Sequence, residues 1–506
     1  MKDKTTTIYK NAILNKATDV LQIFIKYIIV IISMLFLGFI FLQSFFGSTF
    51  LDFCESSFFI EKPFWSTVLI VLIPILIAII VKIILQKYSI SIVTPNYIFL
   101  GIVTVVYTIL MIMFVYKTGI PAMDDQELIL NAANDLLNNV PDMWDKGAYC
   151  YRFPNQNGFV LFVALGLKMF GADNQMVFQY LNIPMLILSS FFLSKTIYLL
   201  FNDKKLARYS YILLLGFFQL NCYVTFVYGT LYGLAASVAG IFLLIKYFKK
   251  RNIVNGLVGI SLLSIGYGFK SNYLIMIVAA CLLLLFDAIV KKSLKSVISL
   301  VWGIVFYVVV VTSISSTIYH LTGKKVDEGT PNTAWVAMGL QESYKAPGWW
   351  NGYNAKVFAD NEYDISKTKE AISQNISERM EELKKDKDYT MSFFSKKTAS
   401  QWSEGTFECF YITNLDRGRL SNPTWTDSVK NLMVDGHSAN RAVTTICNYF
   451  IVFLWLGIIL FLIFDFRKLD AYKLIFAITF IGGFLFHLVW EAKGQYTIIY
   501  AYLMIP

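Results

Sequence analysis

The amino-acid sequence predicts an all-α protein with many membrane-spanning helices. Hydrophobic residues make up 56% of its 506 residues and charged residues only 15%, whereas an ordinary soluble protein has about 25% charged residues. Apolar runs of about 20 residues, enough for a helix to cross a bilayer, recur along the chain. Lysine and arginine gather in some of the intervening loops and are scarce in others, and this asymmetry orients membrane helices. These observations favour a multi-pass protein of the cell membrane.

We expect about 12 spans of this kind. The Lys-bearing start of the chain precedes an apolar run that is too long for the core of a signal peptide, so we expect a retained first span. The expected spans lie at 24–46, 65–86, 97–116, 178–200, 209–227, 231–248, 253–269, 272–290, 297–320, 446–465, 473–490 and, shorter than the others, 495–506.

The basic loops are expected to face the cytoplasm. They are the N-terminal tail and the loops with Lys82 and Lys87, Lys204 to Arg208, Lys246 to Arg251, Lys291 to Lys295, and Arg467 to Lys473. The loops 47–64, 117–157 and 321–445 then fall on the outer side. The segment 158–200 must therefore cross an odd number of times. We expect 178–200 to cross and the short run 158–170 to lie at the interface or to enter only partway.

The polar segments also suggest how the chain is organised. We expect an N-terminal two-span hairpin (1–96), a transmembrane core (97–320), an outer loop domain (321–445) and the last spans (446–506). A long polar segment of this size is usually functional.

Within the loop domain, Ser366–Tyr389 is expected to form a helix. Ile372, Ile376, Met380 and Leu383 recur at helical spacing, while Glu and Lys occupy the other faces. The stripe should pack against the rest of the loop domain.

An acidic pair, Asp124-Asp125, follows the third expected span and opens a helical segment in the first large outer loop. Carboxylates at a membrane surface stay ionised cheaply only where water or a polar ligand reaches them. The pair therefore indicates either chemistry or a cation site at the lipid–water boundary. The alternative is that the pair caps a helix next to the membrane, where acidic residues complement the helix dipole.

Composition and spacing argue against two other classes of site. The sequence contains no soluble module with a basic stripe and interleaved aromatic residues, so we expect no nucleic-acid partner. The six cysteines and three histidines are scattered without metal-ligand spacing, so we expect no zinc site and no certain cofactor. A divalent cation held by the oxygens of Asp124, Asp125 and Glu404 stays open.

The order of these features resembles the GT-C superfamily of membrane glycosyltransferases. The resemblance rests on the acidic pair, on the YRFPNQNG segment that begins at Tyr151 and leads into an apolar run, and on the large outer loop after six further crossings. WVAMGLQ, GWWNGY, KTASQWSEGTF and the closing WEAKGQY are similar to the Gram-positive branch associated with cell-wall polysaccharides and teichoic acids. The resemblance covers most of residues 97–506.

The resemblance implies a polyprenyl-phosphate sugar as donor and a cell-wall glycan or teichoic acid hydroxyl as acceptor, with inversion, on the outer face of a bacterial cytoplasmic membrane. It implies an aspartate as the general base, for which we assign Asp125, with Asp124 as the second choice. Neighbouring helical residues point about 100° apart, so only one of the two can face the sugar. Pro154-Asn155 stands where the family usually has Pro-Pro, so the local geometry of that entry stays open.

Further candidates fill the other roles that this reaction needs. A lipid phosphate needs cationic partners, for which we single out Arg152, Lys270 and Arg441. Lys270 interrupts an apolar stretch at the outer end of a span, where a lysine either marks function or merely extends to the interface. The expected substrate-binding residues are Gln126, Gln156, Asn157, Trp350, Glu404 and Glu491.

Two alternatives belong to other classes. About 12 spans would also suit a transporter or a flippase for lipid-linked saccharides, but such proteins typically contain internal repeats, and none is evident here. A polysaccharide polymerase or ligase would share the lipid and the large outer loop, and would be expected to rely on Arg and His in that loop.

Overall fold

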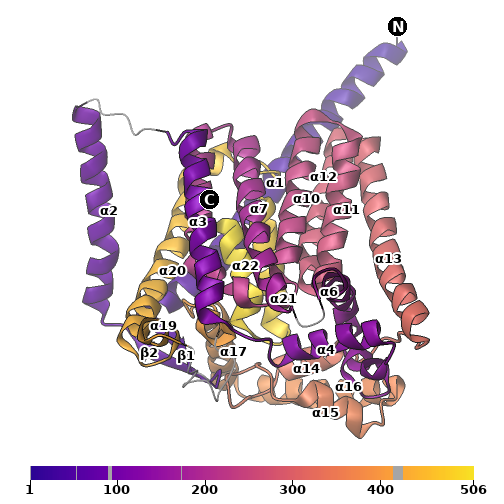
Figure 1. Cartoon of the computed structure of the whole chain (residues 1–506). Helices are drawn as coiled ribbons and strands as arrows, with labels where there is room; N and C mark the ends of the chain where they lie inside the picture. Colours follow the sequence, from indigo (N-terminus) through magenta and orange to yellow (C-terminus); the bar gives the residue numbers. More distant parts are fainter. Residues whose placement is uncertain (1, 53, 89–93, 172–173, 414–424) are drawn as a thin grey trace.

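The computed structural model describes residues 2–52, 54–88, 94–171, 174–413 and 425–506, with side chains from residue 18 onward. Figure 1 shows a bundle of long helices with a layer of shorter ones across one end. We call this the loop end, defined by α4 (Asp125–Asn138), α14 (Thr333–Gly339) and α16 (Ile365–Lys385). The opposite end, with Lys204, Lys250 and Lys291, is called the basic end.

Among the described residues, eight helices are long and apolar enough to cross a membrane. This confirms the predicted all-α, multi-pass class; the number of spans and the GT-C fold stay predictions. The eight belong to α1 (Lys2–Phe46), α2 (Phe64–Lys87), α3 (Tyr97–Thr118), α7 (Met176–Phe201), α10 (Thr230–Lys250), α12 (Leu274–Lys291), α13 (Leu294–Thr322) and α20 (Ser438–Phe464).

Shorter elements complete the bundle and its loop end. The shorter helices are α6 (Asn157–Phe170), α8 (Lys204–Leu215), α9 (Phe218–Cys222), α11 (Ile253–Phe269), α21 (Ile475–Val489) and α22 (Gly494–Met504), of which α11 and α21 are apolar along their length. The loop end also carries α5 (Tyr149–Arg152), α15 (Tyr353–Asp360), α17 (Lys387–Trp402), α18 (Cys409–Thr413), α19 (Asp427–Met433) and an antiparallel hairpin of β1 (Gly47–Leu51) and β2 (Ser57–Glu61).

The core lies where α10 packs between α7 and α11. Two glycines allow α10 and α11 to touch: a Cβ on Gly240 would lie 2.6 Å from the carbonyl oxygen of Gly259, and one on Gly259 would lie 2.9 Å from that of Gly240. Small residues at such crossings let the backbones of membrane helices approach closely. This contact fixes the two helices that carry the site: Tyr228 lies just before α10, and Lys270 lies just after α11.

The expected continuous span at 209–227 is wrong. Helix α8 ends at Leu215, and the chain continues as the short α9 and a 3-10 turn at Tyr223–Thr225. Side-chain hydrogen bonds hold the break: Asn221 donates to the carbonyl of Leu215 (2.9 Å) and Gln219 to that of Gly405 (2.9 Å). The Asn221 amide thus satisfies the Leu215 carbonyl, which a continuous helix would have paired, and the Gln219 amide ties the break to the distant segment that contains Gly405.

Two other expectations about helices can be compared with the structure. The run 158–170 falls in the 14-residue α6, shorter than the span-length helices, and packs against α4. The predicted helix at Ser366–Tyr389 is confirmed as α16, with Ile372 and Leu383 buried as expected, but it ends at Lys385. Met380, which was expected in the same apolar stripe, is 38% exposed.

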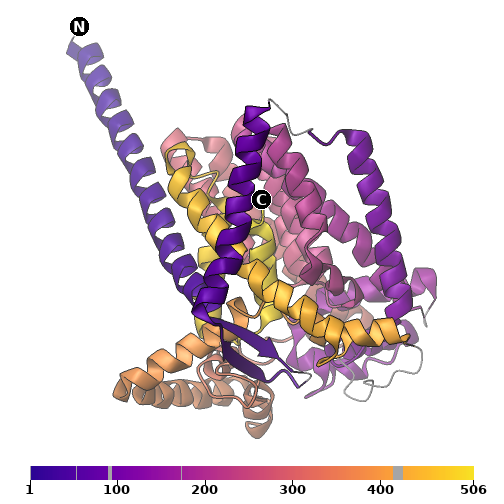
Figure 2. The same ribbon diagram turned by 90° about the vertical axis from the view of Figure 1, so that its left-hand side faces the viewer.

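The N-terminal hairpin divides into a packed helix and a separate one. Helix α1 packs against α20 and α21, whereas α2 stands apart from the bundle (Figures 1 and 2). Between them, the β-hairpin brings Glu55 to the loop end, where its backbone is held at a φ of 60°. The first 96 residues therefore contribute a charged side chain to the region described next.

Candidate active site at the loop end

Asp125 opens α4 and takes part in a short chain of hydrogen bonds. The Tyr228 hydroxyl donates to Oδ2 of Asp125 at 2.8 Å, and Nε2 of Gln156 donates to the Tyr228 oxygen at 2.7 Å. The Asp125 residue is itself exposed. Its carboxylate is thus oriented by Tyr228 while solvent, or a substrate, can still reach it.

The position of Tyr228 follows from the broken helix before it. Oε1 of the buried Gln126 accepts a hydrogen bond from the Val227 amide at 2.7 Å, and Nδ2 of Asn182 donates to the carbonyl of Phe226 at 3.2 Å. Gly229 then turns the chain into α10 with a φ of +77°, and a Cβ there would lie 2.3 Å from the carbonyl of Phe269. Only glycine suits that conformation at that distance.

Asp124 occupies the N-cap position of α4, but its side chain does not cap the helix. Its backbone has φ 50° and ψ −128°, a combination that a residue with a Cβ rarely adopts. Strained residues of this kind persist only where the surroundings impose them, and they cluster at functional sites. Of the acidic pair, Asp125 is the one that contacts Tyr228.

Lys270 lies between α11 and α12 with its ammonium group above the Tyr228 ring, 3.9 Å from the centroid. The residue is only 8% exposed, and its Nζ has no hydrogen-bond partner among the described residues. Burial lowers the pKa of Lys270 to about 7, against the opposing effect of the Asp125, Glu408 and Glu491 carboxylates. A buried ammonium group without an acceptor is costly, and the aromatic ring compensates only in part.

The turn between α21 and α22 brings a second lysine to the same region. Burial raises the pKa of the Glu491 carboxyl, which accepts a hydrogen bond from the Tyr496 hydroxyl at 3.2 Å. Lys493 carries a raised pKa, because the attraction of nearby carboxylates outweighs its burial. Lys493 is a site residue that sequence reasoning missed, although it lies inside the WEAKGQY segment that was singled out.

Glu55 connects this turn to the loop domain. Its Oε1 accepts a hydrogen bond from Nζ of Lys493 at 2.9 Å, and its Oε2 contacts Nζ of Lys345. The Glu55 side chain is 1% exposed, so both ion pairs are shielded from water. Sequence separations of 290 and 438 residues explain why no local pattern could have revealed these contacts.

Three other predicted residues lie in segments next to Asp125. Asn157 is fully buried, with Oδ1 accepting from the Trp144 indole at 3.1 Å and Nδ2 without a partner. Nε2 of Gln126 and the buried Nε of Arg152 also lack partners in the described part of the chain. The guanidinium carbon of Arg152 lies 5.2 Å from the Phe153 ring centroid.

The remaining predicted residues have other surroundings. Arg441 is exposed on the first turn of α20, which packs against α19, and Trp350 is 41% exposed near Lys345. Glu404 is buried and accepts hydrogen bonds from its own loop, from the Thr406 amide and hydroxyl (2.9 and 2.6 Å) and from the Glu408 amide (2.9 Å). Burial raises the pKa of Glu404.

These contacts also bear on the cation that Asp124, Asp125 and Glu404 were considered to hold. Both Glu404 oxygens are engaged by its own loop, and the described residues contain no group of three His, Cys, Asp or Glu that could hold a metal ion. The structure does not assemble that cation site.

The arrangement has a clear chemical capacity. An exposed carboxylate fixed by a tyrosine lies beside a buried lysine that lacks an acceptor, and a second lysine and a buried carboxyl lie close by. Such a region can bind an anion through Lys270 while Asp125 accepts a proton from a neutral group next to it.

Comparison with known proteins places the chain in a family. Residues 24–505 match the family model described as a conserved hypothetical integral membrane protein, so the chain belongs to that family. No curated protein and no solved structure matches it. The match agrees with the apolar helices and with a bilayer as the environment of the chain.

Proposed function

We propose that this protein is a membrane glycosyltransferase that moves a monosaccharide from a polyprenyl-phosphate sugar to a hydroxyl of an acceptor glycan or polymer. The observation that carries the proposal is Lys270: a buried ammonium group with no acceptor among the described residues, adjacent to the ring that orients Asp125. A buried charge of this kind tends to mark a functional site in a membrane protein. The phosphate of the donor would supply the missing anion.

In this reaction Asp125 is the general base. The acceptor oxygen forms a bond to the anomeric carbon while the bond from that carbon to the phosphate oxygen breaks, and the acceptor proton passes to Asp125. The lipid phosphate leaves with the electron pair of the broken bond and gains negative charge. Attack opposite the leaving group inverts the anomeric carbon. The Tyr228 hydrogen bond orients the carboxylate, and the exposure of Asp125 lets the acceptor reach it.

The cations complete the reaction. Lys270 would bind the phosphate of the donor and stabilise the charge that develops as it leaves. Lys493 lies near enough for its charge to lower the pKa of Lys270. Positive charge from Lys493 therefore reaches the region in which the donor phosphate would bind.

Sugar transfer in reconstituted vesicles tests the proposal. Vesicles would receive a panel of radiolabelled polyprenyl-phosphate monosaccharides and cell-wall acceptor, with wild type compared with Asp125→Asn and Asp124→Asn. Asp145→Asn is the matched control, since Asp145 is a partly exposed carboxylate of the same loop that pairs with Lys324 instead. We expect transfer by wild type and by the control, and its loss in Asp125→Asn. Absence of transfer from every donor would overturn the glycosyltransferase proposal. Full activity of Asp125→Asn would overturn the assignment of the base.

A further inference from the structure

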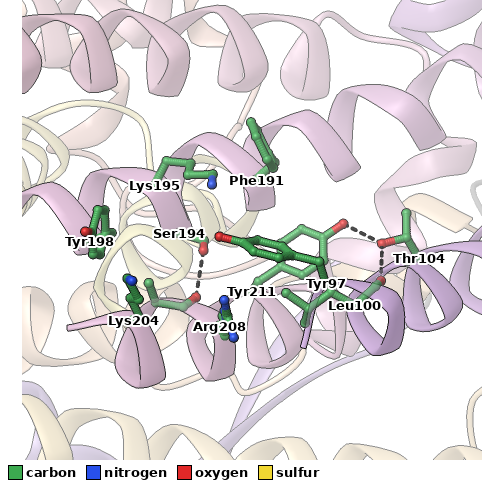
Figure 3. Close-up of a pocket in the computed structure, with 12 residues that line it drawn as sticks. Tyr97, Leu100, Thr104, Phe191, Ser194, Lys195, Tyr198, Lys204, Arg208 and Tyr211 are labelled. Carbon is green, nitrogen blue, oxygen red and sulfur yellow. Dashed lines mark hydrogen bonds between the residues drawn. The ribbon is translucent and has the colours of Figure 1, made fainter. Parts of the chain in front are cut away.

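A cavity lies at the basic end of the bundle, on the opposite side from Asp125. It has a volume of about 260 Å³ and is formed by α3, α7 and α8 (Figure 3). Three cationic side chains line it, Lys195, Lys204 and Arg208, and no carboxylate does. The site at the loop end uses none of these residues.

The cations surround one aromatic residue. Tyr97 lies with its ring 4.4 Å from the guanidinium carbon of Arg208 and 5.9 Å from Nζ of Lys195. In Figure 3 its hydroxyl points between these two side chains. Arg208 also donates to the carbonyl of Pro95 at 2.7 Å, which fixes its position. In the described residues, neither Lys195 nor Lys204 has a carboxylate within ion-pair distance.

The nearest carboxylate in sequence is already engaged. Asp203 caps α8 by accepting hydrogen bonds from the amides of Lys205 and Leu206, at 2.7 and 3.0 Å. The polar groups on the floor of the cavity are also paired, because Ser194 donates to the carbonyl of Ala207 (2.6 Å) and Thr104 bonds to Tyr211 (2.8 Å). The positive charge around the cavity is thus left for a ligand.

The shape of the cavity points to a lipid. Its lining on α3 extends from Tyr97, the first helical residue, to Thr104, a distance of about 10 Å along the axis. Lys204 and Arg208 lie on the first two turns of α8 and Tyr97 begins α3, so these groups lie near helix ends. Lys195 reaches Tyr97 from within α7, and Leu100 and Gly101 lie further along α3. The neighbouring face of α3 is apolar and exposed, with Ile98 at 75% and Ile102 at 55%. An acyl chain could follow that face from the cavity.

We propose that this cavity binds the anionic phosphodiester headgroup of a phospholipid in the leaflet at the basic end. Lys195, Lys204 and Arg208 contact the headgroup, and Tyr97 supports it at the interface, where tyrosine is favoured. Basic pockets between membrane helices at the cytoplasmic surface recognise anionic lipid headgroups in this way. The proposal is independent of the sugar-transfer reaction.

Native mass spectrometry of the full chain in detergent tests the site, with phosphatidylglycerol and phosphatidylcholine as titrated lipids and inorganic phosphate as competitor. We expect one phosphatidylglycerol to bind in preference to phosphatidylcholine. Its affinity should fall roughly tenfold or more in the double variant Lys195→Gln/Lys204→Gln. The double variant Lys249→Gln/Lys250→Gln removes the same charge from exposed lysines at the same end and should bind as wild type does.

A second variant tests the cavity without changing its charge. A Cβ on Gly101 meets no atom within 4 Å, so Gly101→Leu can fill the cavity without a clash at its first atom. We expect this variant to lose preferential phosphatidylglycerol binding while keeping its thermal stability. Equal binding of the two lipids by wild type, or equal losses in both double variants, would overturn the proposal. Displacement of the lipid by millimolar inorganic phosphate would also overturn it, because the ligand would then be a free anion.

Discussion

Two buried charges near opposite ends of the bundle have contrasting surroundings. Asp287 on α12 is fully buried, and both of its carboxylate oxygens accept hydrogen bonds. Arg251 binds it with both terminal nitrogens, at 2.5 and 2.8 Å, and the hydroxyls of Tyr472 (2.5 Å) and Ser296 also donate to it. Lys270 is 8% exposed and has no hydrogen-bond partner in the described part of the chain.

The difference separates two uses of charge in one apolar protein. A buried carboxylate with a bidentate arginine and two hydroxyls is fully compensated, so it ties α10, α12 and the segment before α21 together. A buried ammonium group above a tyrosine ring retains a need for an anion. The number of partners, and not burial alone, therefore distinguishes the structural charge from the one that we propose to be functional.

The largest effect is expected at Asp125. Replacing Asp125 with Asn should lower the rate of sugar transfer by about 10²–10⁴-fold, the range for loss of a general base. Thermal stability should stay within error, because the residue is exposed. Initial rates in vesicles, with melting curves on the same preparations, check both parts. A rate reduced less than about fivefold would not fit the range expected for a base.

Glu55 is a third buried charge, and it pairs with two lysines at once. Glu55→Gln leaves Lys345 and Lys493 near each other without their shared carboxylate, and breaking a buried pair costs about 3 kcal/mol or more. We expect a lower melting temperature in detergent and weaker donor binding. Glu61→Gln, an exposed glutamate of the same hairpin, serves as the control. Unchanged stability of Glu55→Gln would show that the network contributes nothing to folding.

In contrast to Glu55→Gln, removal of the Lys270 charge should not lower the melting temperature. Lys270→Met removes a buried charge that has no hydrogen-bond partner in the part of the chain that the structure describes, so the melting temperature should be unchanged or higher. Sugar transfer should fall about 10²–10³-fold, as for loss of one group that stabilises a developing negative charge. A variant that melts well below wild type would indicate that Lys270 is a structural charge, as Asp287 is.

The smallest effect on function is expected at Asp287. Asp287→Asn weakens charged hydrogen bonds worth about 1.5–3 kcal/mol each, so the melting temperature should fall. Sugar transfer per folded molecule should match wild type, because Asp287 lies near the end of α12 at the basic end, whereas Asp125 opens α4 at the loop end. Loss of transfer by well-folded Asp287→Asn would mean that the two ends are coupled.

The sequence predicted the parts of the fold that depend on local patterns. Apolar length identified the long helices, and helical periodicity identified α16 from Ile372 and Leu383. Hydropathy failed at 209–227, where Gln219 and Asn221 pair with distant and local carbonyls and divide the helix. Average hydropathy does not register two amides among apolar neighbours, although these amides hold the break in the helix that precedes Tyr228.

The sequence singled out residues whose types are unusual in their segment, and their functional roles stay predictions. Asp125 stood out next to a span and Lys270 inside an apolar stretch, and the structure brings both to Tyr228. Lys493 was missed because its importance depends on Glu55, 438 residues away. Glu404 looked equally suitable from its aromatic neighbours, but its hydrogen bonds run to its own loop. Only three-dimensional contacts separate these cases.

The pH dependence of donor binding tests the central claim, that Lys270 is a cation awaiting a lipid phosphate, most directly. Burial lowers the pKa of Lys270 to about 7, so the ligand-free protein loses this charge as the pH rises through that value. A non-hydrolysable polyprenyl phosphodiester keeps one negative charge throughout the range. Its affinity for wild type should therefore fall above pH about 7, by up to roughly tenfold per pH unit.

Lys270→Arg provides the matched comparison, because arginine stays protonated across the same range. Its affinity for the phosphodiester, measured by fluorescence titration between pH 5.5 and 9 (roughly two pH units on each side of the Lys270 value), should be nearly independent of pH. A decline in wild type that is absent from Lys270→Arg is the result we predict. Identical pH profiles for the two proteins would contradict the claim.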